Sequence, residues 1–472
     1  MSEEVFDLIV IGAGPGGYVA AIRASQLGMR VAVVEKRPTL GGVCLNEGCI
    51  PSKALLDSSE LFLLARDKFA LHGIDIEPPR LNLQTMMARK DGVVKKLTDG
   101  VSFLFKKNRI TLIDGTASLV GRGSDDALHE IRITKESESS SLFAEKVLLA
   151  TGSEAVEIPS ISFDGKIIVG ARDALSFEAI PEHLLIVGAG YIGLELGSVW
   201  RRLGSKVTFV ETLPKMLPTT DGQVADALMR ALKKQGMKFI MEARVTAVSV
   251  KEGKAVVRIT AMEESEDIIC DRVLVAAGRR PVIAGLGLEE TGVKTNLQGR
   301  VIVDGNYQTS VRGIYAIGDL IPGPMLAHRA MEEGVVFAER LNGEASEVEY
   351  EFLPGVCYTW PEAAGVGKTE EELKDENIPY VAGRFNFMGN GRARCMDETE
   401  GFVKVLAQAE TGKALGIHII GPRASDMIAE AVTVMTYGGT VEDIAMTFHA
   451  HPTLSEAIKE AALDVRKRAI HV

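Results

Sequence analysis

Cysteine is scarce in this chain of 472 residues, which contains five: Cys44, Cys49, Cys270, Cys357 and Cys395. Such an odd and sparse set is typical of a reducing compartment and excludes the disulfide framework of a small secreted protein. Any disulfide is therefore expected to be catalytic. Long basic runs are missing too. The chain has 53 lysines and arginines and 64 acidic residues, which gives a net charge of −11. Nucleic acid is not an expected partner, because its phosphates require a basic surface.

Long hydrophobic runs are also absent. The uncharged stretch from Leu8 to Ile22 is interrupted by glycine and proline. The residues before it include Glu3 and Glu4, where a secretory leader would be basic. We therefore expect neither a signal peptide nor a membrane span, and we predict a cytoplasmic location. No metal site is predicted.

Glycine, by contrast, is abundant. The chain has 48 glycines and a hydrophobic fraction of 46%, a composition typical of a turn-rich α/β protein. A length of 472 residues is too great for one hydrophobic core and indicates about three domains.

Two glycine-rich turns follow apolar segments that predict buried strands. Each turn leads into an apolar helix, a second strand and an acid 23 positions after the first glycine. In such a βαβ unit the glycines permit a tight turn and close approach of a pyrophosphate, and the acid binds a ribose hydroxyl. The copies contain Gly12, Gly14, Gly17 and Glu35, and Gly188, Gly190, Gly193 and Glu211. One copy could be a plain turn, but two copies with matching acids predict that two dinucleotides bind.

The elements of these units can be placed by their patterns. We predict strands at 6–11, 30–34, 184–187 and 206–210, and helices at 18–27 and ending near 203. Apolar segments at 147–152, 273–278 and 313–319 indicate further buried strands that end in small-residue turns. Asp319, at the end of the last one, is either a ligand for the ribityl or pyrophosphate group of a flavin or a surface acid.

The pattern changes near Glu349. Alternating apolar segments such as 401–406 are followed by helical patterns at 425–437 and 454–468. This predicts an α+β domain at the C-terminal end of the chain.

Cys44 and Cys49 lie five positions apart, shortly after the first nucleotide motif. In a regular helix this spacing is about 7.5 Å of rise, whereas bridged Cα atoms lie about 4.4–6.8 Å apart, so a distorted backbone is expected. Gly48 supplies the freedom, and Pro51 suits the first turn of a helix that begins at Cys49. Helix N-termini lower thiol pKa values, and Lys53 adds positive charge. The pair is predicted to be redox-active rather than structural.

The residues from Cys44 to Lys53, Cys-Leu-Asn-Glu-Gly-Cys-Ile-Pro-Ser-Lys, resemble the motif of dihydrolipoamide dehydrogenases, within class I of the pyridine nucleotide disulfide oxidoreductase family. The resemblance covers essentially the whole chain. It implies an α/β fold with two Rossmann-like dinucleotide-binding domains and a C-terminal α+β dimerisation domain. The implied division is 1–150 and 279–348 for FAD, 151–278 for NAD, and 349–472 for the dimer interface.

The family also implies roles for individual residues. Cys44 exchanges with the substrate, Cys49 contacts the flavin, and Glu195 pairs with Lys53, the alternative for Glu195 being a solvated acid on a helix. Further implied contacts to FAD are Gly115, Thr151, Gly152, Ser153, Asp319 and Ala327, and to NAD they are Val245 and Gly278. The preference for NAD over NADP has a physical basis, because the Glu211 carboxylate suits a ribose 2′-hydroxyl and repels a 2′-phosphate.

Residues 449–456, His-Ala-His-Pro-Thr-Leu-Ser-Glu, match the family signature of a histidine base and an orienting glutamate. These are His451 and Glu456, and a histidine titrates in the range that suits proton removal from a dithiol. Thr453 and Glu456 equally fit a helix capping box with Thr453 as the N-cap, and both roles can coexist. His449 fits a packing or surface role. In the family the base comes from the partner subunit, so a homodimer is implied.

The implied reaction is the reoxidation of protein-bound dihydrolipoamide through a Cys44–Cys49 disulfide and FAD, with NAD as acceptor. The implied partners are lipoyl carrier domains of 2-oxo acid dehydrogenase or glycine cleavage complexes, and no local motif indicates which. The alternatives are a reductase for glutathione, mercuric ion or coenzyme A disulfide, and a non-catalytic flavoprotein. Trp360 and the glycine-rich segment 387–391 depart from the family pattern, which leaves the local surface and docking unassigned.

Overall fold

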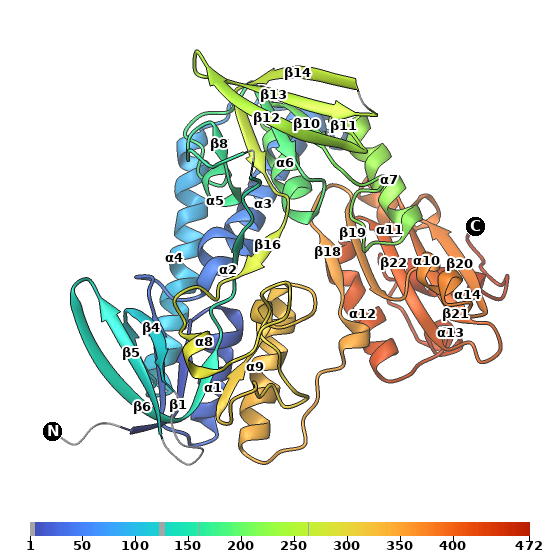
Figure 1. Ribbon diagram of the computed structural model, residues 1–472. Coiled ribbons are helices and arrows are strands. Elements are labelled where there is room, and N and C mark those ends of the chain that lie inside the picture. Colours follow the sequence, from blue (N-terminus) through green and yellow to red (C-terminus); the bar gives the residue numbers. More distant parts are fainter. Residues whose placement is uncertain (1–4, 122–127, 160, 263) are drawn as a thin grey trace. The chain divides into compact units, whose positions relative to one another are not determined.

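The computed structural model describes residues 5–121, 128–159, 161–262 and 264–472 (Figure 1). The chain divides into two compact units, each assembled from separate segments. Unit 1 consists of Met1–Leu55, Gln84–Val156 and Gly278–Val348, and unit 2 of Leu56–Leu83, Glu157–Ala277 and Glu349–Val472. Among the described residues, no helix has both the length and the hydropathy needed to cross a bilayer.

Unit 1 is built around a sheet with the strand order β3-β2-β1-β6-β5-β4, in which β17 also pairs with β6. These strands are β1 (Val5–Ile11), β2 (Val31–Glu35), β3 (Thr111–Asp114), β4 (Thr116–Val120), β5 (His129–Lys135), β6 (Glu138–Leu149) and β17 (Ile314–Ala316). β1 is parallel to both neighbours, with Val10 opposite Val33 and Leu148. β2 is buried along its whole length, as expected for an inner parallel strand.

Helices α1 (Pro15–Gln26) and α9 (Ala327–Leu341) pack side by side in unit 1 (Figure 1). They approach closely, since a Cβ atom on Gly334 would lie 2.7 Å from the carbonyl oxygen of Gly16. The first helix starts at Pro15 rather than at 18, because the fixed φ of proline suits a first helical turn. Unit 1 also contains α2 (Gly42–Glu47), the start of α3 (Cys49–Asp67), most of α4 (Leu83–Lys107), β7 (Ser153–Ala155), β16 (Arg279–Pro281), α8 (Leu288–Thr291) and η2 (Gly318–Leu320).

Unit 2 repeats the parallel arrangement in a sheet with the order β11-β10-β9-β15-β8. Its strands are β8 (Ile168–Val169), β9 (His183–Val187), β10 (Lys206–Val210), β11 (Lys238–Ile240) and β15 (Arg272–Val275). β9 is parallel to β10 and β15, with Ile186 opposite Phe209 and Leu274. The helices of this part are α5 (Ala171–Ala174), α6 (Tyr191–Arg202) and α7 (Gly222–Lys234). The second predicted βαβ unit is thus confirmed.

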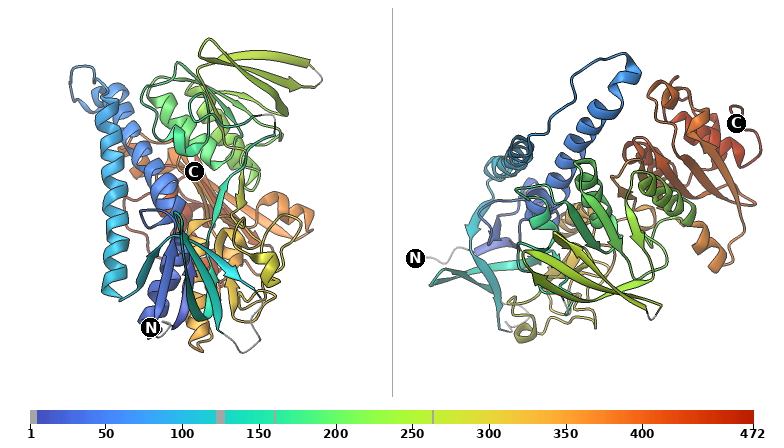
Figure 2. Two further views of the ribbon diagram at one scale, coloured as in Figure 1. Left: turned by 60° about the vertical axis from the view of Figure 1, so that its left-hand side comes forward. Right: turned by 90° about the horizontal axis from the view of Figure 1, so that it is seen from above.

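A separate antiparallel sheet of three strands belongs to the same unit (Figures 1 and 2). It consists of β12 (Ala243–Lys251), β13 (Lys254–Ala261) and β14 (Glu264–Cys270). Its inward side chains share a hydrophobic core with β9 and β15, so the two sheets pack against each other.

The C-terminal part of unit 2 is an antiparallel sheet with the order β18-β19-β22-β21-β20. The elements are β18 (Gly355–Cys357), β19 (Glu362–Gly367), α10 (Glu370–Asp375), β20 (Tyr380–Asn386), η4 (Phe387–Gly389), α11 (Gly391–Cys395), β21 (Phe402–Gln408), β22 (Ala414–Gly421), α12 (Ala424–Thr436), α13 (Val441–Met446) and α14 (Glu456–Asp464). Residues of α12 and α14 share one core with Ile417 and Ile419 of β22, so both helices cover the same face. The predicted α+β domain is confirmed, although α14 is shorter than the predicted helix at 454–468.

A buried ion cluster joins two parts of unit 2. Lys404 of β21 is 2% exposed, and its Nζ lies 2.7 Å from the Asp221 carboxylate and 2.6 Å from that of Glu370. Asp221 also caps α7 by accepting a hydrogen bond from the backbone N–H of Gln223. Burial acts to raise the pKa of Glu370, but hydrogen bonds from Lys374 and Lys404 outweigh it and lower that pKa to about 2.

Candidate active site

The first and third glycines of each fingerprint are required by the fold. Gly12 has a φ of 102°, and a Cβ atom there would lie 2.5 Å from the Ala150 carbonyl oxygen. Gly188 has a φ of 105°, and a Cβ atom there would lie 2.6 Å from the Ala276 carbonyl oxygen. A Cβ atom on Gly17 or Gly193 would lie 1.9 or 2.4 Å from the carbonyl oxygen of the first glycine. These glycines make the turn and allow the helix to pack on the strand.

The fold does not require glycine at the middle position of either fingerprint. Gly14 and Gly190 have φ values of −71° and −86°, which any residue adopts. A Cβ atom on Gly190 would meet nothing within 4 Å, and one on Gly14 would meet the Gly42 Cα at 3.9 Å. Each residue precedes the N-terminus of a long helix, where backbone N–H groups favour an anion. The two turns therefore fit the close approach of a dinucleotide pyrophosphate.

The two acids are held in the same way. The Glu35 carboxylate accepts hydrogen bonds from the backbone N–H of Ala13 at 2.8 Å and of Arg37 at 2.9 Å. The Glu211 carboxylate accepts from Ala189 at 2.7 Å and from Leu213 at 2.9 Å. Both acids are thereby oriented next to a fingerprint turn, and a carboxylate oxygen has further capacity to accept a bond from a ribose hydroxyl.

Several residues that the family implies for FAD lie in the same unit as the first turn. Gly115, with a φ of 152°, donates its N–H to the Glu35 carbonyl oxygen at 3.0 Å. The Thr151 hydroxyl donates to the Val282 carbonyl oxygen at 2.7 Å. Gly152 has a φ of 70° and open space where a Cβ atom would be, and Ala327 is the first residue of α9.

Arg279 was missed by the sequence reasoning. Its Nε donates to the Ser153 hydroxyl at 2.8 Å, and its guanidinium also donates to the Ser153 carbonyl oxygen at 2.5 Å. The Ser153 hydroxyl in turn donates to the Asp319 carboxylate. Burial lowers the pKa of Arg279, whereas the charges of Asp319 and Cys49 act in the opposite direction. This cation therefore supports Asp319 and lies within electrostatic reach of the predicted redox pair. In the sequence, the one indication that Arg279 belongs to the site was its position directly after Gly278, a predicted cofactor contact.

The cysteine pair has the predicted break in the helix. α2 ends at Glu47, Gly48 has non-helical angles of φ −138° and ψ −113°, and α3 begins at Cys49. The pKa of Cys44 is raised, first by its side-chain hydrogen bond with Cys49, then by burial and by the negative charge of Cys49. The contact with Cys49 therefore disfavours the thiolate form of Cys44. The positive charge of Lys53 acts in the opposite direction on Cys44, as expected from its place one turn into α3.

Glu195 and the two further residues implied for NAD lie in different environments. Glu195 of α6 is 5% exposed and accepts a hydrogen bond from the backbone N–H of Tyr358 at 3.2 Å, which rules out a solvated acid. The Val245 side chain packs in the core beside β13. Only backbone atoms of Val245 could therefore contact a ligand. Gly278, which belongs to unit 1, has a φ of 131° and no atom within 4 Å of a Cβ position.

His451 and Glu456 form the predicted pair. The imidazole Nδ1 lies 2.9 Å from one Glu456 oxygen, and the other oxygen accepts the Thr453 N–H at 2.8 Å. The His451 side chain is 78% exposed, so its Nε2 side is accessible. Burial acts to raise the pKa of Glu456, but the hydrogen bonds from Thr453 and His451 outweigh it and the pKa is lowered.

The predicted capping box is half correct. Glu456 does bind the N–H of Thr453, but the Thr453 hydroxyl donates to the Ala450 carbonyl oxygen at 2.8 Å instead of capping the helix. α14 starts only at Glu456, with Ser455 as its N-cap. The hydroxyl therefore closes the turn that carries His451.

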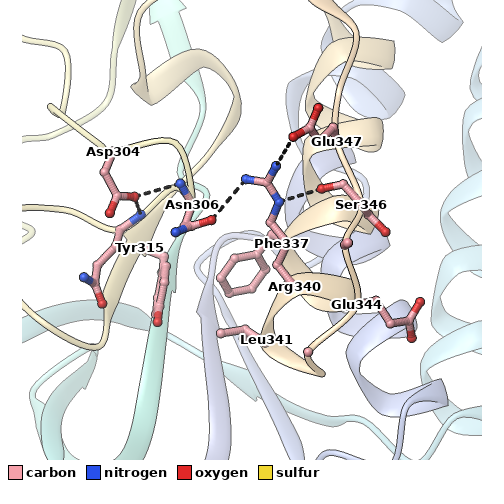
Figure 3. A pocket seen from close by; sticks show the side chains of 12 residues that line it. Asp304, Asn306, Tyr315, Phe337, Arg340, Leu341, Glu344, Ser346 and Glu347 are labelled. Atoms are coloured by element: carbon pink, nitrogen blue, oxygen red, sulfur yellow. Dashed lines mark hydrogen bonds and ion pairs between the residues drawn. The ribbon is translucent and has the colours of Figure 1, made fainter.

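A cavity of about 510 Å³ lies elsewhere in unit 1 (Figure 3). Its polar groups satisfy one another: Arg340 donates to the Ser346 carbonyl oxygen at 2.6 Å and to Asn306 at 3.3 Å, and Asp304 accepts the Asn306 N–H at 2.8 Å. No residue of the predicted site is among those that line it. The cavity is therefore not the candidate active site.

Comparison with known proteins agrees with this geometry. A model of the pyridine nucleotide-disulphide oxidoreductase family matches residues 6–334, and one of its dimerisation domain matches residues 353–462. The chain is 46% identical to dihydrolipoyl dehydrogenase 1, mitochondrial, of Arabidopsis thaliana, over 99% of this chain and 91% of that protein. It is 47% identical to a leghemoglobin reductase of Glycine max, over 97% of this chain and 87% of that protein.

A solved structure is also similar. LpdA of Mycobacterium tuberculosis matches with a TM-score of 0.89 and 28% identity, over 96% of this chain and 98% of that chain. The matches agree with two nucleotide turns, a paired dithiol and a C-terminal sheet domain in one chain. Because the family model alone covers more than half of the sequence, we conclude that the chain belongs to the pyridine nucleotide-disulphide oxidoreductase family.

Proposed function

We propose that this enzyme is a dihydrolipoyl dehydrogenase that reoxidises protein-bound dihydrolipoamide and reduces NAD. The observation that carries the proposal is the Cys44–Cys49 contact, which lies in the same unit as the first nucleotide turn. The full-length similarity to a dihydrolipoyl dehydrogenase supports the choice of substrate. When bound, FAD supplies the two-electron chemistry that links the dithiol to NAD.

The residues of the chain account for the thiol chemistry. In the oxidised enzyme, His451 takes the proton from one thiol of dihydrolipoamide, and the resulting thiolate attacks the Cys44 sulfur. The Cys44–Cys49 bond breaks and Cys49 leaves as a thiolate. The second substrate thiol then attacks the mixed disulfide and its proton passes to Cys44, which releases lipoamide and leaves Cys44 as a thiol. Two electrons and two protons have passed from the substrate to the protein.

The electrostatics of the cysteine pair agree with exchange at Cys44 and a thiolate at Cys49. The raised pKa of Cys44 favours the thiol form of the exchanging sulfur, which supports our assignment of the thiolate to Cys49. We assign Lys53 and Arg279 to the stabilisation of this charge, and Glu195 to the pairing with Lys53. Glu35, Gly115, Thr151, Gly152, Asp319 and Ala327 are assigned to FAD, and Glu211, Val245 and Gly278 to NAD.

The dimerisation domain supports a homodimer. We further propose that the His451–Glu456 pair of one subunit serves the cysteine pair of the other. Monomers separated by size that keep full lipoamide activity would contradict this arrangement. The partners are lipoyl carrier domains of 2-oxo acid dehydrogenase or glycine cleavage complexes, and a cytoplasmic location remains a prediction.

The substrate assignment is tested by comparing two reactions at equal enzyme concentration. One is NAD reduction by dihydrolipoamide, and the other is glutathione disulfide reduction by NADPH. We expect the first to be fast and the second to be absent, because Glu211 disfavours a 2′-phosphate. Fast glutathione reduction without lipoamide activity would keep the fold and the thiol chemistry but refute the substrate and the cofactor preference.

A further inference from the structure

The glycine-rich segment at 387–391 contains two buried side chains, Phe387 and Asn390, between exposed residues. Phe387 is fully buried, and a Cβ atom on Gly389 would lie 2.5 Å from the His471 carbonyl oxygen. Asn390, between η4 and α11, is 3% exposed. The glycine at 389 therefore follows from close packing against the C-terminal residues, whereas a Cβ atom on Gly391 would meet nothing within 4 Å.

Asn390 uses both ends of its side-chain amide. Its Oδ1 accepts the backbone N–H of Ala393 at 2.9 Å and so caps α11. Its Nδ2 donates to the carbonyl oxygen of Thr453 at 2.9 Å. The second bond reaches a residue 63 positions away, two residues after His451. A buried amide thus connects the 387–391 segment to the turn that carries the exposed histidine.

The bonds continue from Thr453 to the imidazole. The N–H of Thr453 is bound by Glu456, and the other oxygen of the same carboxylate holds His451 Nδ1. On the other side of His451, the ring of His449 lies 2.7 Å from the Glu430 carboxylate of α12 and is 5% exposed. The turn is therefore anchored two residues before and two residues after the exposed imidazole.

We propose that Asn390 is a positioning residue for the His451 base, acting through Thr453 and Glu456. The inference rests on the proposed function, because it assigns Asn390 a part in the thiol half of that reaction. A residue 78% exposed has few contacts of its own to fix its ring, so the orientation must come from the turn beneath it. Without the Asn390 bond, Thr453 moves and the Glu456 carboxylate no longer holds Nδ1 in place.

The variant Asn390→Asp separates this role from helix capping. Aspartate keeps the acceptor for Ala393 and remains a good N-cap, but it replaces the donor to Thr453 with an oxygen. Asn386→Ala is the matched control, because the Asn386 amide at the end of β20 is exposed and bonds the Arg384 side chain. NADH oxidation by an artificial acceptor measures intact holoenzyme, since that reaction does not require the base.

The test is a double-mutant cycle on the holoenzyme, with dihydrolipoamide and NAD as substrates. We expect N390D to lower kcat about 10-fold with Glu456 present, and less than about 2-fold in the E456Q background. N386A and all rates of NADH oxidation should match the wild type. Unchanged turnover in N390D, or an equal loss in both backgrounds, would overturn the proposal while leaving the function intact. Wild-type enzyme that does not oxidise dihydrolipoamide would remove both.

Discussion

The substitution Gly190→Ala separates nucleotide binding from folding. Alanine is a poor N-cap residue and costs about 0.5–1 kcal/mol there. It also reduces the entropy of the unfolded chain, which contributes about 0.4–1 kcal/mol in the opposite direction. Because φ is −86° and the added methyl meets no protein atom within 4 Å, no strain is added. The unfolding temperature should stay within about 2 °C of the wild type.

NAD binding should nevertheless weaken. The methyl group occupies the space through which the pyrophosphate approaches the backbone, so we expect an affinity loss of at least about 10-fold, or 1.4 kcal/mol. Titration calorimetry with NAD on the holoenzyme measures this, and the FAD content should not change. Gly188→Ala is the contrasting variant: a φ of 105° and an oxygen at 2.6 Å predict a stability loss of about 2–5 kcal/mol. Unchanged NAD affinity in Gly190→Ala would refute the assignment of this turn.

Three other variants test the remaining parts of the account. Arg279→Met should weaken FAD binding about 10-fold, because it removes the bond to Ser153, whose hydroxyl holds Asp319. Arg280→Met, at an exposed ion pair, should retain FAD in the same flavin assay. Glu456→Gln should lower lipoamide turnover about 10-fold; because the pKa of Glu456 is lowered, this deficit should persist across neutral pH and shrink only as acid protonates the wild-type carboxyl. Lys404→Met should cost about 3–5 kcal/mol in urea unfolding, because it leaves a buried carboxylate uncompensated. Lys374→Met removes an exposed cation from Glu370, which keeps its bond to Lys404, and should cost under about 1 kcal/mol.

Local patterns predicted the nucleotide-binding part of the fold well. The strand predicted at 206–210 is β10 with the same bounds, and the break between the cysteines falls at Gly48 as expected. These features depend on neighbours in the chain: apolar residues in a run, a glycine before a helix, and a proline in its first turn. Such signals are present in a single sequence.

Contacts between distant segments were not predictable in this way. Arg279 bonds a serine 126 positions away, and Asn390 bonds a threonine 63 positions away, so no local pattern connects the partners. The capping prediction failed for a different, local reason. Thr453 has the right spacing to Glu456, but its hydroxyl donates to the carbonyl oxygen of Ala450, three residues earlier in the same turn. Spacing alone cannot decide whether the hydroxyl accepts a bond from the helix or donates one to the turn before it.

The central claim is that electrons from dihydrolipoamide reach the flavin through Cys44 and Cys49. Anaerobic titration of the flavin absorption with dihydrolipoamide, in the wild type and in Cys44→Ser, tests it most directly. The wild-type spectrum should change with dihydrolipoamide, and the variant spectrum should change with NADH alone. A Cys44→Ser enzyme that dihydrolipoamide reduces as readily as the wild type, or a wild-type flavin that it cannot reduce, would contradict the account.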